Sequence, residues 1–353
     1  MNLLKSANHF IHDHLLKLLL AMYGLAILFP SFGIGIKNLS IGNLRWGTST
    51  GIHLSLPFLM LSYLLFNAGL SVHFRDFKKV FLVPLPLGIG LLSNILVPLV
   101  FTAVVAGLGK VFWHNPDEVQ NVLVGLAIIA SMPIAGSATA WVQNGNGNAA
   151  LILGLVVFST VLSPIFSPLV FHAIGYLTTG DYSEDLHELA NQGASSFLIV
   201  SVAMPALIGM TIRLFLSDST WAKIAPNLKT VALVDLLILN YSNASMSLPI
   251  AFKNWDPDFF AMIIGVTCLL CIVTFSLGWL IPKVLKVPTS ERISLTYGLG
   301  MTNNGTGLVL ASTTLADHPF VMLPIIFYNL GQQIVAGILN SKLSRKLGKN
   351  IKK

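Results

Sequence analysis

The sequence predicts an all-α polytopic membrane protein with ten transmembrane helices, arranged as two inverted five-helix repeats in which helices four and nine are broken and cross. Three observations lead to this fold class. Of the 353 residues, 54% are hydrophobic and only 10% are charged, whereas soluble domains carry about 25% charged residues. Ten apolar runs approach the length of about 20 residues that a helix needs to cross a bilayer. Two of these runs, the fourth of each group of five, are interrupted by glycine and small polar residues.

The apolar runs follow one another without a linker or a polar stretch large enough for a soluble domain. A single membrane domain is therefore expected over residues 1–353. The first run follows Lys5 and Lys17 as in a signal peptide, but no small-x-small cleavage site comes after it, so we expect an uncleaved span. The predicted spans are 16–36, 52–72, 80–108, 121–142, 148–175, 195–216, 230–252, 259–282, 293–316 and 319–341.

The distribution of Lys and Arg orients these spans, because cytoplasmic loops retain basic residues. With the N-terminus inside, 17 of the 21 Lys and Arg residues fall in inner segments and four fall in outer loops. The pattern predicts a protein of the plasma membrane (the inner membrane in bacteria) with both termini cytoplasmic and a basic cytoplasmic tail at 342–353. A basic surplus suggests nucleic acid in a soluble protein, but here it follows membrane orientation, so no nucleic-acid partner is expected.

The two interrupted runs read PIAGSATAWVQNGNGN at 133–148 and GLGMTNNGTG at 298–307. Such residues lower helix propensity, and the backbone groups freed by an unwound turn cannot face lipid. Two interrupted spans in corresponding halves of a chain indicate the binding site of a transporter. The alternative is that the small residues only allow helices to pack closely.

Five spans per half is an odd number, so a second half that repeats the first must be inserted upside down. The predicted repeats are 16–175 and 195–341, and they place both broken helices near the bilayer midplane. Half-helix N-termini would then offer N–H groups to an anionic substrate. Unwound carbonyls and half-helix C-termini would offer oxygens to a hard cation such as Na⁺.

At these residues the chain resembles the bile acid:sodium symporter (BASS/SBF) family of the bile/arsenite/riboflavin transporter superfamily. The stretch from 133 through GN at 147–148 to SPIFSP at 163–168 keeps the spacing of the family's fourth and fifth spans. GMTNNG at 300–305 is in register with the end of the family's Glu-x-Gly-Met-Gln-Asn-Ser-Gly motif. The resemblance implies a core domain of helices three to five and eight to ten, a panel domain of helices one, two, six and seven, and a site between them.

The chain also departs from the family pattern. The family's sodium-binding glutamate falls at Gly298, with no carboxylate within several residues. A sodium site here would depend on neutral oxygens, which bind cations more weakly because ligand charge helps to set affinity. The family's other polar positions also differ here. The span-four Ser-Asn pair falls at Ala138 and Thr139, the two helix-five hydroxyls fall at Ile152 and Val156, and the span-three glutamine falls at Ser93.

Candidate binding residues lie at the two breaks. Amides offer donors and an acceptor to a substrate, although the asparagines could instead cap the broken helix ends and the hydroxyls could bond back to their own helices. The predicted substrate-binding residues are Asn303, Asn304, Gly136, Ser137 and Thr139. The predicted cation-binding residues are Leu299 and Met301, through their carbonyls, with Thr302, Ser93 and Asn94.

Asp235 is the acidic residue placed well inside a predicted span. An intramembrane carboxylate is by default a functional hypothesis, so Asp235 could replace the missing glutamate as a coupling carboxylate. The alternative, which we favour, is structural pairing with Arg213 or Lys229. Further along the same span, Asn240, Tyr241 and Asn243 could line the cavity.

The function predicted is secondary active transport by alternating access, as cation-coupled symport of a small organic anion, with Na⁺ expected from the family. The alternatives are proton-coupled or uncoupled transport, or a non-transporting relative that acts as a receptor. No nucleophile–base pair or metal-ligand cluster of recognisable spacing supports an enzyme, and Cys268 and Cys271 fit buried helix residues. The expected partners are the organic anion, Na⁺ or H⁺ and the lipid bilayer, with no cofactor beyond the coupling ion.

Overall fold

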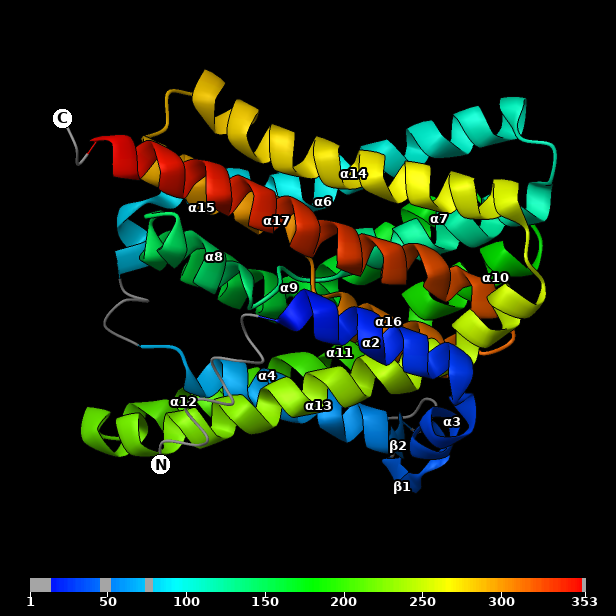
Figure 1. The fold of residues 1–353 in the computed structure, drawn as a ribbon, viewed down its shortest axis with the longest axis horizontal. Helices are drawn as coiled ribbons and strands as arrows, with labels where there is room; N and C mark the ends of the chain where they lie inside the picture. The colour runs from blue at the N-terminus through cyan, green and yellow to red at the C-terminus, as the bar shows by residue number, and fades with distance from the viewer. Residues whose placement is uncertain (1–13, 45–51, 74–78, 351–353) are drawn as a thin grey trace.

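The computed structural model describes residues 14–44, 52–73 and 79–350. Most helices run along one direction and form an elongated bundle (Figure 1). Within the described residues, five helical stretches are long and apolar enough to cross a membrane, so the chain is an all-α membrane protein. These stretches are α6 (Pro84–Phe112), α9 (Ala149–Gly175), Ala194–Phe215, α14 (Pro257–Val284) and Pro319–Leu343, the last of which includes most of α17 (Met322–Asn350).

The first predicted span is sharply bent. α2 (Leu15–Leu28) and α3 (Pro30–Asn38) meet at an angle of 94°. Pro30 begins α3, where its missing N–H breaks no helical hydrogen bond. Phe29 lies outside the helical region (φ −132°, ψ 60°), because a proline disfavours helical backbone angles in the residue before it. The bend shortens the helix that was predicted to extend over 16–36.

A β-hairpin follows α3, which the sequence did not lead us to expect. β1 (Ser40–Leu44) pairs antiparallel with β2 (Ile52–Ser55). α4 (Leu56–Leu70) then begins, so the apolar run predicted as a span from residue 52 starts as a strand. Short apolar runs do not distinguish a strand from a helix by periodicity.

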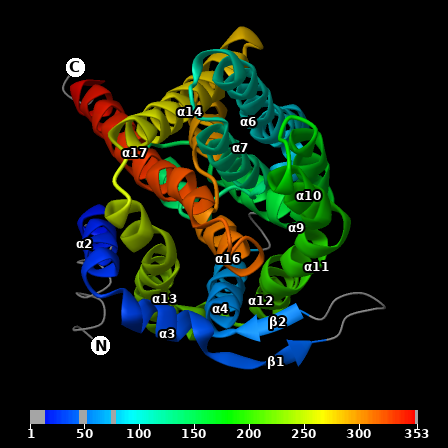
Figure 2. The ribbon, with the colours of Figure 1, turned by 90° about the vertical axis from the view of Figure 1, so that its right-hand side faces the viewer.

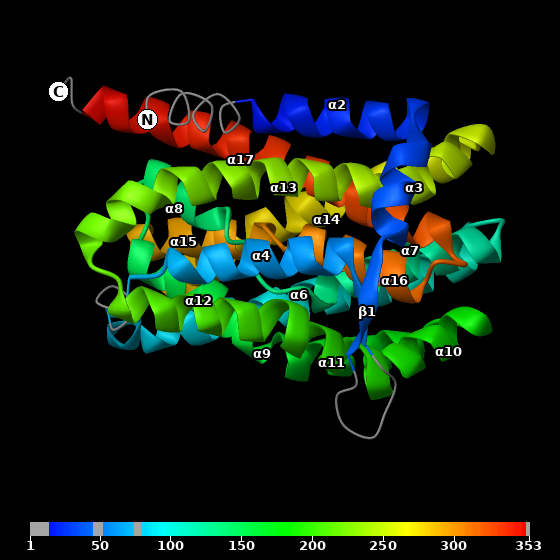
Figure 3. The same ribbon diagram turned by 90° about the horizontal axis from the view of Figure 1, so that it is seen from below.

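One group of packed helices contains α2, α4, α12 (Met204–Phe215) and α13 (Asp218–Lys253) (Figure 3). α13 contacts both α2 and α4, and α4 lies against α12. A Cβ at Gly69 of α4 would overlap a backbone carbonyl of α12, and a Cβ at Gly209 of α12 would overlap a carbonyl of α4. Glycine at both positions therefore allows the two backbones to touch, as small residues do between membrane helices.

The second group surrounds α7 (Pro116–Ser131), which is buried over almost its whole length. α7 packs against α6, α9 and α17 (Figure 2). α15 (Thr289–Gly300) packs against α14, α6 and α9. Between the two groups, a continuous helical path with two π-helical turns leads from the second group into α12. Its members before α12 are α10 (Asp181–Glu188), η2 (Leu189–Gly193), α11 (Ala194–Leu198) and η3 (Ile199–Ala203).

Helices are interrupted in both of the glycine-rich segments. α7 ends at Ser131 and α8 (Ala138–Asn144) begins after six residues of extended or turn backbone. α15 ends at Gly300, and α16 (Asn304–Thr314) follows after three residues. α17 continues through residues 342–350 of the predicted basic tail, and 351–353 lie outside the described residues.

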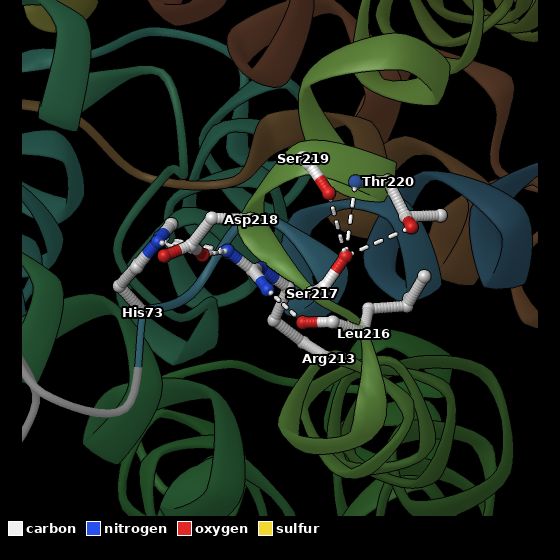
Figure 4. A network of polar contacts seen from close by, with 7 residues as sticks. All are labelled: His73, Arg213, Leu216, Ser217, Asp218, Ser219 and Thr220. Atoms are coloured by element: carbon white, nitrogen blue, oxygen red, sulfur yellow. Dashed lines mark hydrogen bonds and ion pairs between the residues drawn. The ribbon is translucent and has the colours of Figure 1, made fainter.

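A charged cluster closes the turn between α12 and α13 (Figure 4). The buried Arg213 side chain donates from Nη2 to Asp218 Oδ1 at 2.6 Å and lies 2.7 Å from His73 Nε2. Hydrogen bonds from Arg213 and His73 hold the pKa of the Asp218 carboxyl below its ordinary value. Ser217 caps α13 by accepting from the Thr220 N–H at 3.2 Å.

Candidate functional site

The two extended segments between the half-helices pair with each other. Ile134 and Thr302 form an isolated antiparallel bridge. The Ala135 N–H donates to the Met301 carbonyl at 2.9 Å, and the Asn303 N–H donates to the Pro133 carbonyl at 2.8 Å. The backbone groups released by the two breaks thus satisfy one another inside the protein, as backbone at membrane depth requires.

Side chains from α9 and α17 hold this bridge. The Ser159 hydroxyl of α9 accepts from the Ile134 N–H at 3.0 Å. The Gln332 amide of α17 accepts from the Thr302 N–H at 3.1 Å and donates to the Thr302 carbonyl at 3.2 Å. Sequence reasoning missed both residues. The signal for Gln332 was the polar sequence NLGQQ inside an apolar run, since polar side chains hydrogen-bond between membrane helices.

A buried hydrogen-bond network extends from Gln332 to the other helix group. Gln332 Nε2 donates to Asn329 Oδ1 at 3.3 Å. Asn329 Nδ2 donates to Tyr23 of α2 at 3.1 Å and to Asn240 of α13 at 3.2 Å, and the Tyr23 hydroxyl donates to Asn240 Oδ1 at 3.0 Å. Asn240, predicted as a cavity residue, therefore links α2 and α13 to the bridge at Thr302.

The two candidate asparagines have different roles. Asn303 is half-buried and caps α16, since its Oδ1 accepts from the Thr306 N–H at 3.3 Å. Asn304 is buried, and its Oδ1 accepts from the Thr302 hydroxyl at 3.2 Å, while its Nδ2 has no hydrogen-bond partner among the described residues. Capping is thus observed for Asn303, and its amide N–H groups remain available for a ligand.

The candidates at the first break are more exposed. Gly136 and Ser137 are exposed, and Thr139, which is half-buried, donates back to the Gly136 carbonyl at 2.7 Å. The alternative in which the hydroxyls bond back to their own helices therefore applies to Thr139. No hydrogen bond joins the Ser137 hydroxyl to another described residue, so it is the hydroxyl available to a ligand.

A cavity of about 40 Å³ brings the two breaks together. Gly136 of the first break and Asn303 of the second both line it, with Thr160 of α9. Its apolar walls come from α4 and α12, including Gly69 and Met210, and from valines of α9, so it lies between the two helix groups. Pockets for small molecules have volumes of roughly 300–1,000 Å³, so this conformation is closed around its candidate substrate site.

Of the two carbonyls proposed for a cation, that of Met301 accepts a hydrogen bond from the Ala135 N–H. Thr302, proposed with them, donates its hydroxyl proton to Asn304, and its carbonyl accepts from Gln332. Ser93 and Leu299 line a separate cavity of only about 10 Å³. Asn94 is buried and lines a different cavity, of about 20 Å³.

The position of the family's glutamate is enclosed by apolar side chains. A Cβ at Gly298 would lie 3.2 Å from Leu155 and 3.4 Å from Ile152, with Ile134 at 3.9 Å. Ile152 is itself at one of the positions where the family carries a hydroxyl. The three side-chain atoms nearest to this Cβ are therefore all apolar, from α9 and from Ile134 of the first break.

Asp235 does not pair with Arg213. That part of our structural alternative is wrong, because the short turn between α12 and α13 brings Asp218 to the guanidinium instead. Asp235 Oδ2 is buried and has no hydrogen-bond partner among the described residues. Of the other two polar candidates on this helix, Tyr241 donates to the Phe29 carbonyl at 2.5 Å. Asn243 Oδ1 accepts from Ser312 at 3.2 Å, while its buried Nδ2 has no hydrogen-bond partner among the described residues.

Comparison with known proteins gives the family of this chain. The model of the sodium bile acid symporter family matches residues 58–254, which is more than half of the chain. The chain belongs to the sodium bile acid symporter family. Proteins of this family are transporters and not enzymes.

The similar curated proteins include two from Bacillus subtilis (strain 168). YbaS is 26% identical over 296 residues, which cover 84% of this chain and 90% of YbaS. The second is described as the sodium-dependent transporter YocS and is 22% identical, with 82% of this chain and 84% of YocS covered. A plant relative, "Probable sodium/metabolite cotransporter BASS2, chloroplastic" of Oryza sativa subsp. japonica, is 22% identical, with 89% of this chain and 68% of that protein covered.

Proposed function

We propose that this protein is a secondary active transporter that couples Na⁺ entry to symport of a small organic anion by alternating access. Ten spans in two inverted five-helix repeats would carry it, with both termini cytoplasmic. The helix group around α7 would act as the core, and α2, α4, α12 and α13 as the panel. The observation that carries the proposal is the backbone bridge between two interrupted helices, next to a cavity at the boundary of the two groups.

An organic anion is favoured by the polar groups at this boundary. α16 begins at Asn304, so its first N–H groups and the positive end of its dipole lie at the break. The amide of Asn303 and the hydroxyl of Ser137 add neutral donors, whereas the apolar walls from α4, α9 and α12 suit a carbon skeleton. No acidic side chain lines the cavity to repel an anion.

Na⁺ is favoured as the coupling ion by the family and by the printed descriptions of two relatives, a sodium-dependent transporter and a sodium/metabolite cotransporter. The second candidate is proton coupling through Asp235, and the observation that favours it is the buried carboxylate oxygen without a partner. Because the side chains nearest to Gly298 are apolar, Na⁺ would bind to oxygens of other residues.

The test is flux into proteoliposomes. The purified protein is reconstituted, and uptake of a panel of radiolabelled carboxylates and sulfonates is measured under an inward Na⁺ gradient, an inward H⁺ gradient or neither. We expect saturable uptake of at least one anion that the Na⁺ gradient accelerates at least tenfold. Acceleration by H⁺ alone that Asp235→Asn abolishes would establish the second candidate. A lack of uptake of every anion, by protein that remains folded, would contradict transport of this substrate class.

A further inference from the structure

A groove of about 830 Å³ lies between α14, α15 and α17, and none of its lining residues belongs to either break. The α15 residues are buried and form its floor, whereas α14 and α17, which run side by side (Figure 1), form its walls. The lining residues of α14 recur at helical spacing from Ile272 to Leu280, and those of α17 recur from Val335 to Leu343. One face of each helix therefore turns toward the groove over about 12 Å at the helical rise.

The walls of the groove are apolar and face outward. Ile272, Leu280 and Ile338 line it and are 56%, 47% and 51% exposed. Both wall helices are long and apolar enough to cross a membrane, so these side chains meet hydrocarbon rather than water. Pockets for small molecules have volumes of roughly 300–1,000 Å³. The groove therefore has the volume of a binding site, and its walls match an acyl chain.

Basic groups lie near one end of the groove. Lys342, near the end of the α17 wall, lines the groove and is exposed. The Arg292 guanidinium carbon lies 5.9 Å from the centre of the Trp279 ring, which also lines the groove. This cation–π contact holds a second positive charge beside the apolar walls.

The two basic residues belong to the same end of the groove. The residues that follow them in sequence, Ile293 and Leu343, both lie within 3.4 Å of a Cβ built at Gly145. None of the described residues that line the groove is acidic. The nearby Glu291 is buried, and one of its carboxylate oxygens accepts from the Asn148 amide at the start of α9 at 3.4 Å. The charge at this end of the groove lining is therefore positive.

A polar group without a partner lies on the floor. The hydroxyl of Tyr297 is buried and has no hydrogen-bond partner among the described residues. Its ring is held by Trp141, which stacks at 6.4 Å, and by Phe275 in an edge contact at 6.2 Å. A buried polar atom without a partner requires an explanation. Tyr297 is five residues beyond Arg292 on α15, which is about 7.5 Å deeper at the helical rise.

We propose that this groove binds one anionic phospholipid. Its phosphate would lie between Lys342 and Arg292, its ester oxygens would accept from the Tyr297 hydroxyl, and an acyl chain would follow α14 and α17. Basic pockets between membrane helices on the cytoplasmic side recognise anionic headgroups, and the basic residues predict that this end is cytoplasmic. A zwitterionic lipid has the same chains but brings a cation to the basic end. The proposal requires a membrane protein but not the coupled transport proposed above.

The position of the groove gives the lipid a structural effect. Its floor, α15, ends at Gly300, directly before the second break. On α17, the lining begins at Val335, three residues after Gln332, which binds both backbone groups of Thr302. A lipid that packs against α14, α15 and α17 together therefore supports the helices that hold the second break.

The experiment measures the melting temperature of the purified full-length protein in detergent as phosphatidylglycerol is added. The comparison lipid is phosphatidylcholine with the same acyl chains. A ligand that binds the folded state raises the melting temperature as its concentration passes the dissociation constant. We expect a rise with phosphatidylglycerol at least twice that with phosphatidylcholine, and one retained phosphatidylglycerol per chain in native mass spectrometry. Equal responses to the two lipids would overturn the proposal.

Two variants locate the effect. Lys342→Gln removes a charge from the lining, and Ile338→Trp fills the groove from an exposed position without changing the charge. We expect each to reduce the difference between the two lipids at least threefold. The matched control is Lys283→Gln, because Lys283 is exposed at the same end of α14 but does not line the groove. A difference that persists in both variants, or that the control loses equally, would overturn the site. A dimer that retains no lipid would also overturn it, since a second copy of the chain would then cover the groove.

Tyr297→Phe separates a lipid contact from a structural one. Because the hydroxyl has no partner among the described residues, phenylalanine should leave the melting temperature without lipid unchanged or higher. Retention of phosphatidylglycerol should decrease at the same time. A large loss of stability without lipid, with retention unchanged, would show that the hydroxyl belongs to the protein and would overturn the proposed headgroup position.

Discussion

The two breaks form one bridge, but they are held differently. At the second break, both backbone groups of Thr302 are bound by the Gln332 amide, and the network continues through Asn329 to α2 and α13. At the first break, one serine hydroxyl binds Ile134, while Gly136 and Ser137 remain exposed. The second break is thus a fixed support, and the first presents the groups that a ligand can reach. A binding site needs both, because accessible donors are effective only when the backbone beside them is held in place.

The largest expected effect on stability comes from replacing Gln332, which supports the second break. Gln332→Ala leaves the N–H of Thr302 and the Oδ1 of Asn329 without a partner, whereas the Thr302 carbonyl keeps its hydrogen bond from the Asn304 N–H. Each buried unpaired group costs about 1–3 kcal/mol, so we expect the greatest loss of melting temperature in the series, together with loss of flux. The control is Gln333→Ala, at the adjacent and half-buried position. Equal stability of the two variants would contradict the assigned support.

Ser159→Ala tests the weaker support at the first break. It leaves the N–H of Ile134 unpaired, which should reduce stability by about 1–3 kcal/mol. Ser163→Ala removes a hydroxyl that bonds within its own helix and should have a smaller effect when both are measured in the same buffer. Chemical denaturation monitored by tryptophan fluorescence gives the comparison, and a reversed order would show that the Ser159 hydroxyl does not hold the bridge.

Substitution of Asn303 separates capping from binding. Asn303→Ala removes the cap of α16 and should reduce stability by about 1 kcal/mol. Asn303→Ser retains an oxygen for the cap but has no amide N–H groups. We therefore expect Asn303→Ser to recover most of the stability while the KM for the transported anion remains raised. Recovery of both properties would mean that Asn303 is only a cap.

The charged cluster at the α12–α13 turn lies outside both breaks, so its substitution should change stability without changing KM. The pKa of Asp218 is lowered in the folded state, so its contribution to stability is present above the unfolded value of about 3.9 and disappears as the pH falls through the folded value. The wild-type melting temperature should therefore exceed that of Asp218→Asn at neutral pH, and the two should converge below about pH 4. KM should be the same in both proteins. A change in KM would show that this turn communicates with the site.

The smallest effect on stability is expected for Ser137→Ala. The hydroxyl is exposed and bonds to no other described residue, so stability should change by no more than about 0.5 kcal/mol. If Ser137 contacts the anion, KM should increase severalfold while kcat is retained. Thr139→Ser keeps the hydroxyl that bonds to Gly136 and is the matched control. An unchanged KM in Ser137→Ala would remove Ser137 from the site.

The sequence alone determined the class of the molecule and the location of its unusual backbone. Long apolar helices follow from composition and run length, and the interruptions before Ala138 and Asn304 follow from the low helix propensity of glycine and small polar residues. Both are properties of short stretches of chain. The bend at Pro30 was readable in the same way, but it lay inside an apolar run that we took to be one span.

Only the tertiary structure decided which groups meet. The partners of Thr302 and Ile134 are 30 and 25 residues away along the chain, on helices whose periodicity does not reveal which face turns toward the bridge. The partner of Arg213 proved to be Asp218, because the tight turn between α12 and α13 brings the two side chains together. The environment of Gly298 likewise depends on side chains from α9 and on Ile134. Local propensity acts within a few residues, whereas hydrogen bonding and burial inside a membrane protein depend on how distant helices pack.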